Sequence, residues 1–181
     1  MASSIKYTPH YTVAEYLQWE GDWELYDGIP VSMSPSPSLK HQQVAGKLFN
    51  QIFNSLSLNE ACRCSVVYET DWHVNQFTAL RPDISVLCGD REGDFIASPP
   101  TLIIEVHSPS TEERDRVVKR EIYQNAGVPI YLQLNPQDHH IKCLALREKG
   151  YEDVYFEGFD LRLTLHEGCE LNLDLKGLFE G

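Results

Sequence analysis

Basic residues are scarce in this sequence. Its 181 residues include 15 Lys and Arg against 27 Asp and Glu, which gives a formal net charge of −12. Nucleic-acid binding without sequence preference depends on Lys and Arg side chains that neutralise phosphates. The composition therefore excludes a broadly basic nucleic-acid-binding surface. Any contact with DNA or RNA must be local, assisted by a metal ion, or shared across an oligomer.

Long apolar runs are also missing. No stretch reaches the roughly 18 apolar residues that a membrane-spanning helix needs, and the first Met is not followed by an apolar signal region. We therefore expect a soluble, cytoplasmic protein without a membrane partner. Hydrophobic residues make up 42% of the chain, and this composition and length fit one domain over residues 1–181.

Cysteines are few and are not spaced as metal ligands. The five cysteines are odd in number and have no CxxC spacing. This pattern favours buried thiols in a reducing compartment over a disulfide framework. Cys62 and Cys64 would share one face of a strand, but two thiolates are a weak basis for a metal site.

Helical and strand periodicities alternate along the chain. A capping box at Thr12 predicts a short helix to about Glu20, and Ser38 precedes a long amphipathic helix. Other segments predict strands at 24–26, 29–33, 65–68, 84–88, 102–106, 129–134, 141–146 and 154–156, and a helix at 112–126. The strand, helix and strand order in the middle indicates an α/β fold with a mixed central β-sheet flanked by α-helices.

Two acidic residues interrupt apolar strands. Asp83 begins the run Asp-Ile-Ser-Val, and Glu105 stands within Leu-Ile-Ile-Glu-Val. A buried carboxylate is unfavourable unless a cation or hydrogen bonds compensate it. If the strands are neighbours, the two carboxylates can converge on one Mg²⁺ or Mn²⁺, with the backbone carbonyl of Val106 and waters completing the oxygen shell. A single acid near a strand end is more often structural than catalytic, but two on adjoining strands favour a metal site.

The helix after Glu105 supplies a possible third group. On a helical projection centred on Val118, Lys119 lies about 100° away, at the border of the buried stripe. Lys119 can extend outward or pair with Asp115 one turn earlier. Alternatively, it points at the metal site, where it would orient a water molecule or stabilise charge on the phosphate.

Taken together, these residues resemble the PD-(D/E)xK, or restriction-endonuclease-like, nuclease superfamily, and within it a large bacterial family of endonuclease candidates. The likeness covers nearly the whole chain. It rests on the following segments: Glu24–Gly28, His41, Arg81-Pro-Asp83, Ile104–Thr111, Asp115 with Lys119 and Tyr123, and Ala126–Pro136. The resemblance implies the superfamily's mixed sheet, a metal site at Asp83 and Glu105, and a further carboxylate from Glu24.

One position departs from the wider superfamily, whose catalytic lysine usually follows the second acid by two residues. This sequence has His107 there. The resemblance to the narrower family suggests that the lysine role has moved to Lys119. His107 lies on the same side of the strand as Glu105, so it is either a weaker substitute or a buried structural histidine.

Several residues are candidates for contact with nucleic acid. Arg114, Arg116 and Arg120 lie on the outer side of the predicted helix, where they either contact the phosphate backbone or form a solvated face. His41 lies on the apolar face of the long helix and is either a buried structural histidine or a site residue.

The sequence thus predicts a Mg²⁺- or Mn²⁺-dependent endonuclease that hydrolyses DNA, acting as a homodimer with one site for each strand. The alternative is a catalytically inactive nuclease fold that binds nucleic acid or a protein, which the charge of −12 favours. A hydrolase of another phosphate ester would share the site but would have a closed pocket instead of an open cleft.

Overall fold

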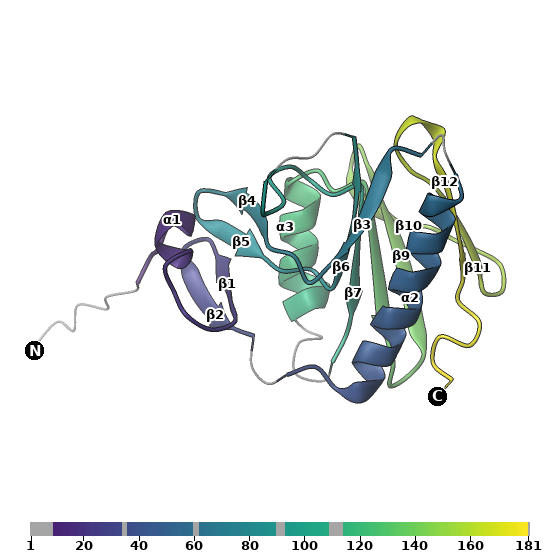
Figure 1. The fold of residues 1–181 in the computed structure, drawn as a ribbon, viewed down its shortest axis with the longest axis horizontal. Helices are drawn as coiled ribbons and strands as arrows, with labels where there is room; N and C mark the ends of the chain where they lie inside the picture. The colour runs from purple at the N-terminus through teal and green to yellow at the C-terminus, as the bar shows by residue number, and fades with distance from the viewer. Residues whose placement is uncertain (1–8, 34–35, 60–61, 90–92, 109–113, 181) are drawn as a thin grey trace, which may run out of the picture.

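A six-stranded sheet lies at the centre of the computed structural model, which describes residues 9–33, 36–59, 62–89, 93–108 and 114–180, with the backbone alone at 114–116 (Figure 1). The elements are α1 (Val13–Tyr16), β1 (Trp23–Tyr26), β2 (Ile29–Ser32), α2 (Leu39–Ser57), β3 (Cys64–Tyr68), β4 (Trp72–Asn75), β5 (Thr78–Leu80), β6 (Ile84–Cys88), β7 (Leu102–Val106), the π-helix η1 (Arg114–Lys119), α3 (Arg120–Asn125), β8 (Ile130–Asn135), β9 (His140–Arg147), β10 (Gly150–Asp153), β11 (Asp160–Thr164), the 3₁₀ turn η2 (His166–Gly168) and β12 (Glu170–Asp174).

The central sheet is mixed. Its strand order is β10-β9-β8-β7-β6-β3. Strands β7 and β8 run parallel, and the other neighbouring pairs are antiparallel. A smaller sheet has the order β2-β1-β5-β4, and β11 pairs with β12. The expectation of an α/β fold with a mixed central sheet is confirmed.

Both faces of the central sheet are covered, which explains why its strands are apolar runs. Leu102, Ile104 and Val106 of β7 pack in the cluster that contains α2 and the β11–β12 hairpin. Ile103, between them, packs on the opposite face with Tyr123 of α3. Alternation along β7 therefore directs Glu105 to the face that carries α3, and Figure 1 shows α2 and α3 on opposite sides of this sheet.

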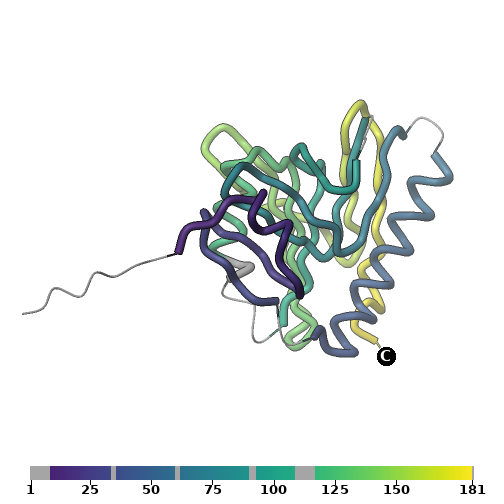
Figure 2. Tube along the Cα trace, turned by 60° about the vertical axis from the view of Figure 1, so that its left-hand side comes forward, coloured from purple at the N-terminus to yellow at the C-terminus, as the bar shows by residue number. Residues whose placement is uncertain are grey.

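The long helix α2 begins where the sequence predicts. The side chain of Ser38 accepts a hydrogen bond from the backbone N–H of His41 at 3.2 Å, as an N-cap does. The C-terminal segment runs along this helix, and Lys47 donates to the carbonyl of Gly177 at 3.0 Å (Figure 2). These contacts fix the start of α2, and with it His41, beside the central sheet.

The helix after β7 differs from its projection. Its described part begins with the π-helix η1 and continues as α3. Val118, which was set at 0° in the projection and belonged to its buried stripe, is 43% exposed, whereas Lys119 is 4% exposed. The projection was wrong because a π-helix closes its hydrogen bonds over five residues, so the 100° step does not hold there.

Strand predictions fail near the C-terminus. Residues 154–156 are not a strand, because β10 forms at Gly150–Asp153 directly after a turn. Gly150 has a φ of 116°, which lets this turn reverse the chain between β9 and β10. The prediction also lacked β4, β5, β11 and β12. In the last two strands every second residue is a buried leucine.

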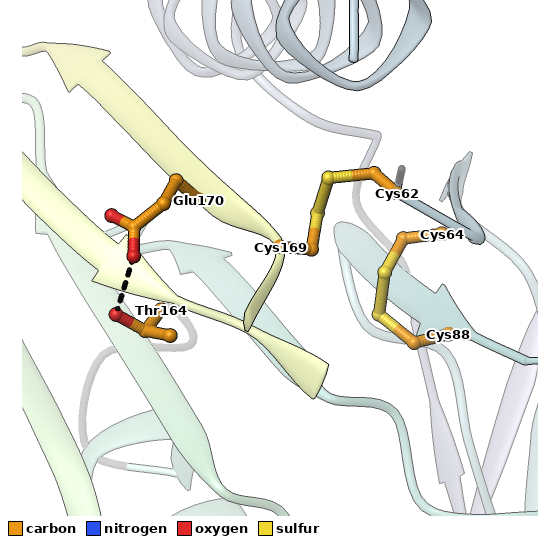
Figure 3. The surroundings of a disulfide bond; sticks show 6 residues. All are labelled: Cys62, Cys64, Cys88, Thr164, Cys169 and Glu170. Atoms are coloured by element: carbon orange, nitrogen blue, oxygen red, sulfur yellow. Dashed lines mark hydrogen bonds between the residues drawn. A yellow bond between two sulfur atoms is a disulfide. The ribbon is translucent and has the colours of Figure 1, made fainter. Parts of the chain in front are cut away.

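The cysteine expectation is corrected by the structure. Cys62 forms a disulfide with Cys169, and Cys64 forms one with Cys88, while Cys143 is a free, buried thiol (Figure 3). The partners are 107 and 24 residues apart, so spacing along the chain gave no sign of them. Burial raises the pKa of Cys143 to about 12, which keeps it a thiol near neutral pH.

None of the helices in the part of the chain that the structure describes is long and apolar enough to cross a membrane.

The Cys62–Cys169 disulfide ties the start of β3 to the β11–β12 hairpin, which packs on α2. We expect the variant with both Cys62→Ser and Cys169→Ser to lose about 2–4 kcal/mol of unfolding free energy, because the disulfide restricts the unfolded chain over a long loop. Urea unfolding of the oxidised proteins measures this difference. As a control, added reductant should lower the unfolding free energy of the original protein and bring it much closer to that of the variant. Equal midpoints for both oxidised proteins would contradict the pairing.

Candidate active site

Asp83 stands at the junction between the two sheets. Strand β5 of the smaller sheet ends at Leu80, and Arg81-Pro82-Asp83 leads into β6 of the central sheet. Strand β6 is antiparallel to β7, with Ile84 opposite Ile104, so extending this register places Asp83 opposite Glu105. Opposite residues on antiparallel strands direct their side chains to the same face. The two acids thus belong to neighbouring strands, as the sequence-based hypothesis requires.

The Asp83 carboxylate is held by two donors. Its Oδ2 accepts a hydrogen bond from the backbone N–H of Val106 at 2.7 Å. The Nε2 of His41 lies 3.2 Å from the same oxygen. The side chain of Asp83 is partly exposed, and Oδ1 makes no hydrogen bond to another described residue. The carboxylate is therefore oriented through Oδ2 and presents Oδ1 as an oxygen donor.

Glu105 is one of the most deeply buried charged residues of the protein, with 2% of its surface exposed. Its Oε1 accepts hydrogen bonds from Lys119 Nζ at 3.0 Å and from Tyr123 Oη at 2.6 Å. Burial, and then the charge of Glu105, raise the pKa of Tyr123 well above its usual value, although Lys119 opposes this. Tyr123 therefore remains a phenol and keeps donating to Glu105.

Glu24 enters the same region from the β1–β2 hairpin and is 1% exposed. Its Oε1 accepts from the backbone N–H of Arg81 at 2.9 Å and lies 3.0 Å from Lys119 Nζ. Its Oε2 accepts from Tyr26 Oη at 2.6 Å. With both oxygens engaged, Glu24 holds Lys119 in place more directly than it offers an oxygen to a metal ion.

Lys119 is the meeting point of these elements. Its ammonium lies 3.0 Å from a carboxylate oxygen of Glu24 and 3.0 Å from one of Glu105. The side chain is 4% exposed, so it does not extend into solvent as the first alternative for Lys119 required. Asp115, the other partner considered for Lys119, has its side chain outside the described residues. The structure thus brings together Glu24, Glu105 and Lys119 on the α3 side of the sheet, and the strand register places Asp83 opposite Glu105.

The other predicted site residues border this cluster or follow it along the chain. His41 is buried against Asp83, which favours the alternative of a buried structural histidine, and its contact with nucleic acid stays a prediction. His107 is buried beyond Glu105 on the same face and lines a cavity with Arg120. Arg120 is exposed, and the side chains of Arg114 and Arg116 lie outside the described residues.

The donor chemistry of the site fits a divalent cation. The carboxylates of Glu24 and Glu105 lie 3.0 Å from the ammonium of Lys119, and the strand register places Asp83 opposite Glu105. With His41 neutral, these three carboxylates carry two more negative charges than this ammonium neutralises. Mg²⁺ in proteins commonly uses one or two carboxylates and fills its other positions with water and substrate phosphate. The described residues contain no group of three or more His, Cys, Asp or Glu arranged as a closed metal cage. Asp83 and Glu105 are therefore the pair that could hold an ion, with an open shell.

Two tyrosines belong to the segments that carry the resemblance but were given no role in the sequence analysis. Tyr26 and Tyr123 each donate a 2.6 Å hydrogen bond to a buried carboxylate. Tyr26 follows Glu24 by two residues on a strand and Tyr123 follows Lys119 by four on a helix, spacings that place each on the same side as its neighbour. Those spacings were the available signal.

Burial makes the Lys119 ion pairs a strong constraint on stability. We expect Lys119→Met to lower the unfolding free energy by about 3–5 kcal/mol, because it leaves two carboxylates buried without their cation. Adding Glu105→Gln to this variant should recover part of the loss, so the two effects will not be additive. Urea unfolding of the single and double variants measures the coupling.

Lys142 provides the matched control. It pairs with Asp153 at 3.2 Å, but the two side chains are 40% and 47% exposed. Lys142→Met should therefore change stability by no more than about 1 kcal/mol. Similar losses for Lys119→Met and Lys142→Met would contradict the importance assigned to the buried pairs.

Comparison with known proteins gives both a family and a fold. The family model described as "Uma2: Putative restriction endonuclease" matches residues 13–176. An uncharacterized protein of Synechocystis sp. is 32% identical over 121 residues, which cover 64% of this chain and 63% of that protein, so the match spans less than two thirds of the relative's length.

A crystal structure from Anabaena variabilis, described as a putative nuclease belonging to DUF820, has a similar fold with a TM-score of 0.73. It is 18% identical and the match covers 93% of this chain and 97% of that one. Since the family model covers both carboxylates and the lysine, the chain belongs to the Uma2 family of restriction-endonuclease-like proteins.

Proposed function

We propose that this protein is a metal-dependent endonuclease that hydrolyses phosphodiester bonds in DNA, with Mg²⁺ or Mn²⁺ held by Asp83 and Glu105. The observation that carries the proposal is the buried Lys119, whose ammonium lies 3.0 Å from Glu105, the residue that the strand register places opposite Asp83. The membership of a family described as restriction endonucleases supports the same reaction class.

Each residue has a defined task in this proposal. Asp83 and Glu105 bind the ion, with the backbone carbonyl of Val106 as a further candidate ligand. The bound ion would polarise the phosphate and lower the pKa of a water molecule. Lys119 donates hydrogen bonds and positive charge toward the attacked phosphate, where negative charge develops.

Four other groups hold this arrangement. His41 and the N–H of Val106 orient Asp83, Glu24 fixes Lys119 from the hairpin side, and Tyr123 fixes Glu105. A site held from the hairpin, the sheet and two helices is prepared before substrate binds, which lowers the reorganisation needed during reaction.

Contacts with DNA must be local in a protein of this charge. Arg120 is the exposed, described arginine nearest to Lys119, and Arg114 and Arg116 precede it in η1. We propose that they contact the phosphate backbone beside the cleaved bond. A homodimer would supply one site for each strand of a duplex, and sedimentation with and without DNA tests this.

A second function is favoured by the net charge of −12. In this alternative the protein keeps the nuclease fold but binds nucleic acid or a protein without cleaving it. A bound ion and its activation of water separate the two functions, because the binding module needs neither.

Metal binding is the first test of the proposed function. We expect Mn²⁺ titrated calorimetrically to bind the protein at one site, and Asp83→Asn to weaken it by about tenfold or more, since it removes a charged ligand. Asp153→Asn, an exposed carboxylate elsewhere in the fold, is the control and should leave binding unchanged. Absence of Mg²⁺ and Mn²⁺ binding, together with no cleavage of single- or double-stranded DNA or RNA, would refute the nuclease proposal.

Cleavage by two further variants assigns the lysine role. We expect Lys119→Met to slow cleavage of plasmid DNA by about 100-fold or more while Mn²⁺ still binds, because the lost group acts on charge in the transition state. His107→Ala should slow cleavage by less than about tenfold, since His107 lies beyond Glu105. Unchanged cleavage by Lys119→Met, or a larger loss in His107→Ala, would move the role to His107.

A further inference from the structure

A cavity of about 590 Å³ adjoins the candidate active site. It lies between the helix η1–α3 and the central sheet. The helix contributes Val117 and Arg120 to its wall, and the sheet contributes His107, Gln133 and Lys142. This volume is in the range of pockets that enclose small organic groups.

Gln133 is the unexpected residue of this wall. It stands in the middle of β8, where the burial pattern is otherwise that of an apolar strand, and it is 4% exposed. Its Nε2 has no hydrogen-bond partner among the described residues. A buried amide without a partner is unfavourable by roughly 1–3 kcal/mol, so such groups commonly meet water or a ligand. The cavity is the space in which that partner can lie.

The register of the sheet fixes the distance from Gln133 to the site. Gln133 is paired with Glu105 across the parallel strands β7 and β8, which places their backbones about 4.8 Å apart. His107 follows Glu105 by two residues on the same face, and Arg120 follows Lys119 directly in the helix. The cavity therefore opens immediately beside the carboxylate and the lysine that would face the cleaved phosphate.

The charges around the cavity are mixed. Arg120 and Lys142 supply positive charge, Glu121 and Asp138 supply negative charge, and Lys142 is already paired with Asp153. A pocket for a free phosphate would have an excess of cations. Mixed charge, a neutral amide donor and the apolar surface of Val117 and Leu144 fit a flat, neutral group that forms hydrogen bonds.

We propose that this cavity holds a nucleobase of the substrate strand, adjacent to the phosphodiester at Asp83 and Glu105, and that Gln133 donates its amide N–H to an acceptor on the base. Gln133 is then a specificity-determining residue. The inference rests on the proposed function, because cleavage of a polynucleotide is what brings a base to this position. Enzymes that act on nucleic acid can accommodate an unstacked base in a closed pocket, where its edge is read by hydrogen bonds.

Free mononucleotides test the cavity without requiring a metal ion or cleavage. The protein is titrated in EDTA with dAMP, dGMP, dCMP and dTMP while the side-chain amide resonance of Gln133 is followed by NMR. We expect at least one of the four to shift this resonance in a saturable way. Deoxyribose 5-phosphate, which has no base, should not shift it. No shift by any mononucleotide at millimolar concentration, or an equal shift by the sugar phosphate, overturns the proposal.

Gln133→Met preserves the length of the side chain and removes the donor. We expect this variant to bind the responsive mononucleotide about tenfold more weakly, while its thermal midpoint stays at or above that of the original protein. Gln76→Met, at an exposed position in the β4–β5 turn, should bind like the original protein. Equal affinity for Gln133→Met would overturn the proposal.

The two hypotheses fail in different ways. Mononucleotide binding that depends on Gln133, without metal-dependent cleavage, leaves the base pocket standing and refutes the nuclease. The opposite outcome is cleavage by the original protein without mononucleotide binding, and with the same base preference beside the cut in the original protein and in Gln133→Met. That outcome supports the nuclease and refutes the base pocket.

Discussion

The ammonium of Lys119, enclosed between Glu24 and Glu105, is the contact on which the arrangement of the site depends. It joins three parts of the chain that are far apart in sequence: the β1–β2 hairpin, strand β7 and the helix η1–α3. Charges removed from water are tolerated only when they are paired and further hydrogen-bonded, and here Tyr26, Tyr123 and the N–H of Arg81 complete the set. Small displacements of these elements would break the 3.0 Å contacts, so the pairing also fixes how far the small sheet and the helix lie from the central sheet.

Under the proposed function, the charge of this cluster would allow an acidic protein to act on a polyanion. Glu24, Glu105 and Asp83, which the register places opposite Glu105, together carry two more negative charges than Lys119 neutralises, an imbalance that one divalent cation would offset. The repulsion between the overall charge of −12 and distant phosphates is screened by salt within about 8–10 Å. A cation in a partly buried site would attract a phosphate that is in direct contact with it. Under the proposed function, affinity for nucleic acid would depend on the ion and on a few arginines near it, and much less on a basic surface.

Sequence patterns predicted the features that depend on local periodicity. Apolar runs marked β6, β7 and β8, and acids that interrupt two adjoining runs identified Asp83 and Glu105. The disulfides could not be predicted, because Cys62 meets Cys169 only after the β11–β12 hairpin folds onto α2. Lys119 was placed only at the border of the buried face, since a π-helix changes the angular step there. Gln133 was missed although it interrupts β8 as Glu105 interrupts β7. A buried neutral amide is less unfavourable than a buried carboxylate, so it is a weaker sign of a functional site.

Placing the lysine on a helix has a consequence for how the site relates to its substrate. A strand lysine would move with the sheet, whereas Lys119 shares its helix with Arg120 and Val117, which form the outer wall of the cavity beside Gln133. Any displacement of η1–α3 on substrate binding therefore changes the distance from Lys119 to Glu105 and the width of the cavity at the same time. The π-helix at η1 is a segment where such a shift is structurally accessible, because its wider turn is less regular than an α-helix and π turns occur often at functional sites. If both proposals hold, recognition beside the cut and charge stabilisation at the cut would be coupled through this one helix.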